Sequence, residues 1–210
     1  MIRKTSLIRR SAAVAAAGTA ALVLAACGGS GDSAAGHVSH TGTSPSAAAS
    51  TPTAQEKHNA ADVTFAQGMI PHHRQAVEMA DLAPSRAKSA EVKKLAEQIK
   101  KAQDPEIKTL SGWLTSWGEQ VPAEGAMDHT AHGAGGMMTA EEMNELEKAS
   151  GTAFDTAFME MMIKHHEGAV SMAKTEKTEG AFPDAKKMAD AIITSQTAEI
   201  TQMNDLLGKS

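Results

Sequence analysis

The feature that most constrains this chain is a motif that occurs twice. The sequence "DVTFAQGMIPHHRQAVEMA", which begins at Asp62, returns 93 positions later as "DTAFMEMMIKHHEGAVSMA", which begins at Asp155. A fixed period indicates one structural unit present more than once, so we predict that the folded region consists of two related units. The offset continues past the motif without a gap, pairing Leu95 with Met188, Ile99 with Ile192, Gln103 with Gln196 and Glu106 with Glu199.

Each unit contains two segments with helical spacing. In the first, alternating steps of four and three residues separate Phe65, Met69, His72, Ala76 and Met79. The matching residues 158–172 repeat these steps, and the runs 96–117 and 189–206 have the same rhythm. Two helical hairpins of this kind predict an all-α fold, a four-helix bundle.

Turn signals separate the predicted helices. The residues Ala83-Pro84-Ser85 are expected to end the first helix of unit one, and Gly180-Ala181-Phe182-Pro183 the first helix of unit two. Thr139 and Glu142 have the spacing of a capping box, which predicts a helix start after the connector. Pro105 is expected to kink its helix or to make it restart.

The amino terminus resembles a bacterial lipoprotein signal peptide. Basic residues, an alanine-rich apolar run and Leu-Ala-Ala precede Cys27, which predicts removal of residues 1–26 and lipidation of Cys27. A plain secretory peptide or an uncleaved anchor is the alternative, and the export route, Sec or twin-arginine, stays open. The chain is therefore expected outside the cytoplasm, anchored to the outer face of the cell membrane.

The rest of the chain divides by composition. Residues 27–54 are rich in Gly, Ser, Ala, Thr and Pro, which predicts a flexible tether. Residues 55–210 form the predicted helical domain, with unit one at about 60–119, unit two at about 139–208 and a connector at 120–138 rich in Met, His and Gly.

Composition excludes several kinds of function. Cys27 is the only cysteine, so its lipidation would leave no thiol for a disulfide, a zinc-thiolate site or a cysteine nucleophile. Without the four basic residues of the leader, 16 basic side chains face 25 acidic ones, which argues against nucleic acid as a partner.

The informative residues are polar ones on apolar helix faces. A polar side chain that is buried without a hydrogen-bond partner lowers the stability of the fold by about 1–3 kcal/mol, so we expect such residues to have a partner or to bind a ligand. His72 and His165 occupy these faces, and their neighbours His73 and His166 lie about 100° further round each helix. Candidate partners in a shared polar layer are Gln103, Glu106, Gln196 and Glu199.

A paired His-His motif with methionines on both sides favours a metal site. Imidazole is the commonest metal ligand, and thioether ligands without thiolates favour copper, as Cu(I) or Cu(II). A methionine on a helix face is also an ordinary packing residue. The candidate ligands are His72, His73, His165, His166, Met69, Met79, Met162 and Met172, with Gln103, Glu106, Gln196 and Glu199 as supporting groups around them.

The connector holds a second candidate site. Its sequence "AMDHTAHGAGGMM" is polar and rich in glycine, so its Met, His and Asp side chains are not expected to pack in a core. One interpretation is weak, exchangeable metal binding. A plain linker is the other. The candidate ligands in this segment are Met127, Asp128, His129, His132, Met137 and Met138.

Two other functions stay open at this point. A carboxylate-bridged iron or manganese enzyme would need Glu-x-x-His, which occurs nowhere in the chain, although a mixed site with Glu106 and Glu199 remains conceivable. Alternatively, the histidines are hydrogen-bonded to Gln and Glu in a protein interaction module without metal. No hydrolase, zinc-protease or phosphate-loop motif occurs, and we do not expect an enzyme.

The residues also resemble a known family. The patterns "F..GMIPHH..AVEMA" and "F..MMIKHH..AVSMA", each followed by "Q..EI", are similar to bacterial secreted proteins grouped as domain of unknown function 305. The resemblance covers most of Ala60 to Leu207. It implies a ferritin-like four-helix bundle and a functional His-His pair, and some relatives are associated with copper. It implies no catalytic activity.

Overall fold

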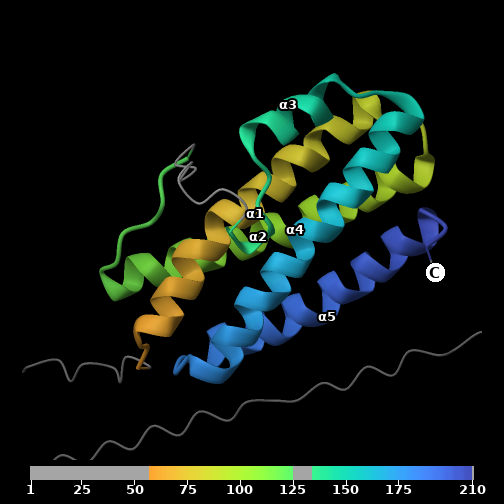
Figure 1. Ribbon diagram of the computed structural model, residues 1–210. Helices are drawn as coiled ribbons and strands as arrows, with labels where there is room; N and C mark the ends of the chain where they lie inside the picture. The colour runs from red at the N-terminus through yellow and green to blue at the C-terminus, as the bar shows by residue number, and fades with distance from the viewer. Residues whose placement is uncertain (1–56, 125–133, 210) are drawn as a thin grey trace, which may run out of the picture. The chain divides into compact units, whose positions relative to one another are not determined.

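The described residues, 57–124 and 134–209 of a computed structural model, form helices as predicted (Figure 1). The all-α expectation is confirmed. The predicted signal peptide, Cys27 and the tether lie outside the described residues. The helices are α1 (Ala60–Arg86), α2 (Ala90–Trp117), a 3-10 turn η1 (Ala134–Gly136), α3 (Ala140–Lys148), α4 (Gly151–Glu179) and α5 (Pro183–Leu206).

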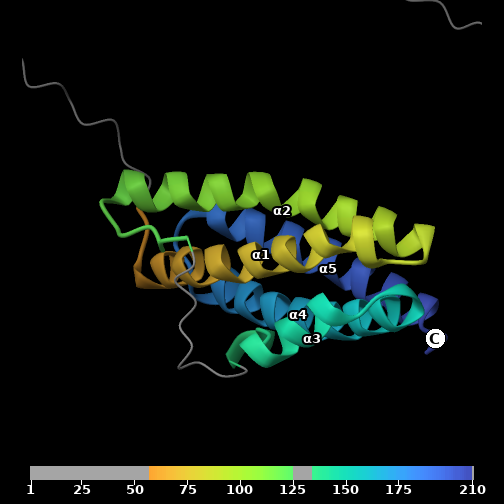
Figure 2. The same ribbon diagram turned by 90° about the horizontal axis from the view of Figure 1, so that it is seen from above.

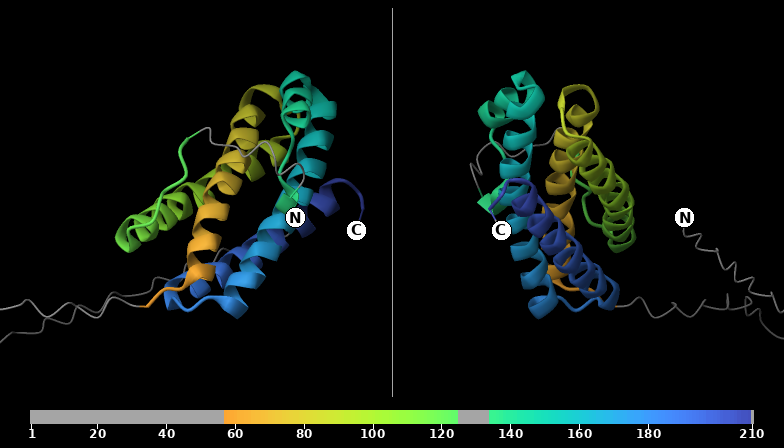
Figure 3. Two further views of the ribbon diagram at one scale, coloured as in Figure 1. Left: turned by 60° about the vertical axis from the view of Figure 1, so that its left-hand side comes forward. Right: turned by 90° about the vertical axis from the view of Figure 1, so that its right-hand side faces the viewer.

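The four long helices form two hairpins that meet through their first members. Helix α1 packs along α2, α4 packs along α5, and α1 and α4 pack against each other. Figure 2 shows α2 running along α1, and the right-hand view of Figure 3 separates the two hairpins. In the part of the chain that the structure describes, no helix is both long and apolar enough to cross a membrane.

The predicted capping box is present but opens an additional helix. Thr139 accepts the backbone N–H of Glu142, and the Glu142 carboxylate accepts the N–H of Thr139. The helix that follows is the short α3, which the hairpin pattern did not predict. It ends at Lys148, before α4 begins at Gly151.

The helix end expected at Pro84 and the restart considered for Pro105 do not occur. Pro84 lies inside the last turn of α1, which continues to Arg86, and α2 runs through Pro105 without a restart. Proline removes the hydrogen bond to the carbonyl four residues earlier, which for Pro105 is that of Lys101. Lys101 is exposed, so water can hydrate its freed carbonyl and α2 continues.

The core consists of two apolar clusters with polar residues between them. One cluster holds Met79, Ile99, Phe158, Met162 and Met203, and the other holds Phe65, Met69, Leu110, Ala173 and Ile192, among others. Along each long helix, the sequence passes from one cluster to the other through buried polar residues. We define the histidine layer as six of these buried residues: His72, His73, Gln103, His165, His166 and Gln196.

Candidate metal centre

The centre of the histidine layer is a pair of imidazoles from the two hairpins. His72 of α1 and His165 of α4 lie with their ring centroids 3.7 Å apart and their planes inclined by 42°. Both side chains are buried. The helical spacing placed these residues on the faces by which α1 and α4 meet, and the structure brings them together.

These two imidazoles have ring nitrogens without partners. The Nε2 of His72 donates its hydrogen to the carbonyl oxygen of Gly135 at 2.8 Å, while its Nδ1 has no hydrogen-bond partner. Neither ring nitrogen of His165 has one. Because an unpaired buried nitrogen is costly, the pair is a candidate for binding a further group.

Burial also keeps the two rings neutral. It lowers the pKa of His72 to about 3, an effect that the nearby His73 and His166 reinforce. The pKa of His165 lies well below its usual value for the same reasons, first burial and then the neighbouring His72. Neutral imidazoles at ordinary pH offer lone pairs to a metal without first releasing a proton.

The second histidine of each motif faces the partner helix of its own hairpin. His73 donates from Nε2 to Glu106 of α2 at 2.8 Å, and His166 does the same to Glu199 of α5 at 2.7 Å. The rings are fully buried, whereas the Glu106 and Glu199 side chains are 21% and 18% exposed. Each pair joins the histidine layer to the molecular surface.

The predicted methionine ligands divide between the two apolar clusters. Met69 belongs to one cluster and Met79 and Met162 to the other, while Met172 is half-buried and packs over Gly68. Met69 and Met162 each precede a central histidine by three residues and so share its helix face. Packing accounts for all four, and the structure adds no contact between their sulfur atoms and a ring nitrogen.

Two glutamines complete the layer. Gln103 and Gln196 are buried at matching places on α2 and α5, and the Oε1 atom of each lacks a hydrogen-bond partner. Together with the histidines, the layer therefore contains seven of the nine unpaired buried side-chain atoms in the described residues. The prediction that Gln103 and Gln196 are buried polar residues was correct.

The connector is part of this site in a way that the sequence did not indicate. Met127, Asp128, His129 and His132 lie outside the described residues. Met138 was expected to lack a packing role, but it is buried and its side chain belongs to the apolar core. Its backbone N–H donates to Gln75 at 2.7 Å and its carbonyl accepts from Gln75 at 2.9 Å.

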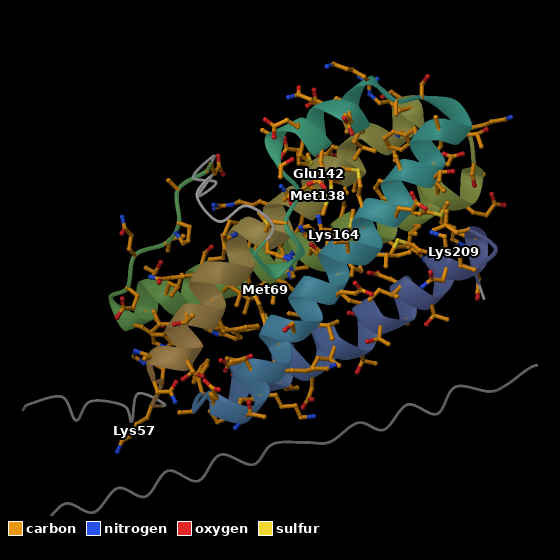
Figure 4. All side chains as sticks on the ribbon, viewed as in Figure 1. Lys57, Met69, Met138, Glu142, Lys164 and Lys209 are labelled. Atoms are coloured by element: carbon orange, nitrogen blue, oxygen red, sulfur yellow. The ribbon has the colours of Figure 1, made fainter. Side chains whose placement is uncertain are left out.

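Gln75 and Gly135 were missed as residues of the site. The one signal was that Gln75 corresponds to Gly168 in the second copy, a change inside an otherwise similar motif. Figure 4 labels Met138, Glu142 and Lys164 where the connector meets α1 and α4. Met137 is half-buried in the same segment.

The described residues do not form a closed ligand set. No three of their His, Cys, Asp and Glu side chains converge as a metal site. The central pair nevertheless fits a soft ion, because it offers unprotonated imidazole nitrogens with methionines one turn away. Such a pair would need a further ligand, and the soft donors on the same helix faces are the sulfur atoms of Met69 and Met162.

Comparison with known proteins identifies the family and similar solved structures. The model of a domain of unknown function, DUF305, matches residues 62–207. A DUF305 protein from Streptomyces coelicolor, described as secreted, is 34% identical over 71% of this chain and 93% of its own, with a TM-score of 0.64. A comparison with curated protein sequences finds no match.

A second similar protein has been solved with metals. CopM in its Cu(I)-bound form is 39% identical over 69% of this chain and 94% of its own, with a TM-score of 0.56. Its Cu(II)-bound form is 37% identical over the same shares, with a TM-score of 0.61. The chain described here belongs to the DUF305 family.

Proposed function

We propose that this DUF305 protein binds copper outside the cytoplasm and either sequesters the metal or passes it on. The observation that carries the proposal is the pair of His72 and His165. The two buried, neutral imidazoles lie side by side and have three ring nitrogens without a hydrogen-bond partner. Such a pair can coordinate a soft cation through its lone pairs, whereas it makes no hydrogen bond that would compensate its burial in the apolar core.

The surroundings of the pair favour copper over other metals. Met69 and Met162 flank it along α1 and α4, and no thiolate is near in the described residues. Imidazole and thioether together suit Cu(I), whereas iron and manganese sites in bundles rest on several carboxylates. That CopM, a similar protein, is known with Cu(I), Cu(II) and silver supports the same choice.

The hydrogen bonds of the outer histidines support a different role for them. His73 and His166 each donate a hydrogen bond to a glutamate of the neighbouring helix, which satisfies the ring nitrogen that faces outward. We propose that these pairs hold the hairpins in register and orient the layer. In this proposal His73 and His166 have a structural role, and copper binds to His72 and His165.

The location outside the cytoplasm rests on two supports. The first residues have the composition of a lipoprotein leader that ends at Cys27. The related protein from Streptomyces coelicolor is described as secreted. We propose that a lipid on Cys27 holds the domain at the outer face of the membrane.

Titration of the purified full-length protein with Cu(I), in competition with a chromogenic chelator, tests the function. We expect the protein to remove Cu(I) from the chelator, and the double variant His72→Ala, His165→Ala to lose this ability. His58→Ala is the control, because His58 stacks on Trp117 outside the histidine layer. Circular dichroism establishes that each variant is folded.

Two results would reject the proposal. One is the absence of competition by the wild-type protein at micromolar concentration. The other is equal competition by the folded double variant and the wild type. Metal analysis that finds iron or manganese, together with loss of metal in Glu106→Ala and Glu199→Ala but not in the double variant, would favour the mixed His/Glu enzyme instead.

A further inference from the structure

The two central histidines differ in one respect that the repeated motif does not explain. His72 donates from Nε2 to the Gly135 carbonyl, whereas His165 has no hydrogen-bond partner on either nitrogen. The difference comes from residues 134–138, the part of the connector that lies against α1 and α4. We call this segment the strap.

Three features hold the strap in place. The Gln75 side chain makes two hydrogen bonds with the backbone of Met138, both of them buried. A Cβ atom on Gly168 of α4 would overlap the carbonyl of Gly135, so only glycine allows the strap to lie this close. Gly135 and Gly136 have φ angles of 68° and 80°, which also favour glycine.

The strap is anchored at its far end as well. The Glu142 carboxylate, in the first turn of α3, forms an ion pair with Lys164 of α4 at 3.3 Å. Gly136 lies against the carbonyl of the same Lys164 residue. The Gly135 carbonyl is therefore held at a defined place beside the ring of His72.

We propose that Gly135 is a positioning residue for the copper site, and that its carbonyl leaves Nδ1 as the atom through which His72 binds the metal. A carbonyl oxygen can only accept a hydrogen bond, so the ring nitrogen facing it must carry the hydrogen. In a neutral imidazole the other nitrogen then carries the lone pair, and that atom, Nδ1, is buried without a partner. The proposal rests on the proposed function, because it names the donor atom of that site.

The repeat shows why this positioning acts on one histidine only. Gln75 in the first copy of the motif corresponds to Gly168 in the second. The Gln75 side chain binds the strap, and the absence of a side chain at Gly168 leaves space for it. His165 has no equivalent strap among the described residues, so no carbonyl of the strap fixes its tautomer. Copper binding would thus use a fixed nitrogen of His72 and either nitrogen of His165.

Nitrogen NMR of the imidazole rings in the full-length protein tests the proposal. In the metal-free wild type we expect His72 as the Nε2–H tautomer. Gly168→Ala should push the Gly135 carbonyl away, and Gln75→Leu should release the strap without a steric clash in α4. In both variants His72 should become a mixture of tautomers, while Gly112→Ala, in an open part of α2, should leave it unchanged.

Titration of the same samples with Cu(I) gives the second measurement. In the wild type the Nδ1 signal of His72 should respond to the metal, and in the two strap variants affinity should fall about tenfold or more, as for other groups that orient a ligand.

A wild-type His72 with its hydrogen on Nδ1, or binding through Nε2 with displacement of the strap, would overturn the proposal and leave copper binding intact. Unchanged tautomer and affinity in variants whose Met138 amide signal shows a released strap would overturn it as well. No Cu(I) response in the wild type would instead reject the proposed function, while the tautomer is still read in the metal-free protein.

Discussion

The carboxylate of Asp155 accepts the backbone N–H of Ser89 at 2.9 Å, although the two residues belong to different hairpins. Asp155 lies in α4 and also accepts the N–H of Lys88, just before α2 begins. Its counterpart Asp62, in α1, accepts the N–H groups of Ala181 and Phe182 just before α5. Each hairpin thus supplies a carboxylate to the N–H groups of the two residues that precede the other hairpin's second helix.

Asp155→Ala should lower the free energy of unfolding by about 1–3 kcal/mol, because it leaves two backbone N–H groups without their charged acceptor. Urea unfolding of the wild type and the variant measures the difference. Asp184→Ala is the control, since Asp184 is an exposed acidic residue in the first turn of α5. If both variants lose the same small amount, the interaction between hairpins is not what stabilises the fold.

Glu176→Gln should change how stability depends on pH. Burial first, and then the neighbouring Asp62, raise the pKa of Glu176 to about 8. The unfolded chain ionises this residue near its usual pKa of 4.5, while the folded protein keeps the proton. The folded state therefore loses stability as pH rises from about 5 to about 8, by at most about 1.4 kcal/mol per pH unit.

The variant should lack this slope, because glutamine does not ionise. Free energies of unfolding at several pH values in this range, for the wild type and Glu176→Gln, give the comparison. Glu179→Gln is a suitable control on an exposed site of the same helix. Parallel curves for the wild type and Glu176→Gln would show that Glu176 ionises normally in the folded protein.

Acid should destabilise the metal-free protein through the central histidines. The pKa of His72 falls to about 3 on folding and that of His165 falls as well, so the unfolded state takes up protons first. Their contribution to stability is complete above about pH 6.5 and is lost as pH falls, for His72 toward about 3. His165→Gln should reduce the slope of stability against pH in this window, whatever its effect on stability at neutral pH. An unchanged slope would contradict the prediction.

Glu106→Ala should destabilise the protein by about 1–3 kcal/mol, because it leaves the buried Nε2 of His73 without its acceptor. Glu199→Ala should have a similar effect through His166, since the two pairs have the same geometry. Thermal unfolding compares both with Glu97→Ala, an exposed position on α2. Losses no larger than that of Glu97→Ala would show that these pairs do not hold the hairpins.

Much of the fold followed from the spacing of residues. Alternating steps of four and three predicted the helices and placed His72 and His165 on the faces that meet. The residue next to each, His73 or His166, was expected further round the helix, and it faces the neighbouring helix of its own hairpin. Residues that act through their position on a regular helix can be predicted in this way, because the geometry of a helix is known in advance.

The remaining features of the fold and of the site depend on contacts between segments that are distant in the sequence, and such contacts follow no periodic pattern. The strap, the role of Gln75 and the closeness of Glu176 to Asp62 all left little local pattern. Gln75 and Met138 are 63 positions apart, and the signal for their contact was a single difference between two copies of a motif.

By itself, the sequence determined that the chain forms helices, that two hairpins share one pattern, and that histidines lie on the apolar faces of those helices. Only the tertiary structure decided which nitrogen of His72 is free, which glutamate each outer histidine binds, and that the connector covers one side of the layer. The physical reason is that periodicity determines the direction in which a side chain leaves its own helix. Its hydrogen-bond partner depends on how separate segments come together.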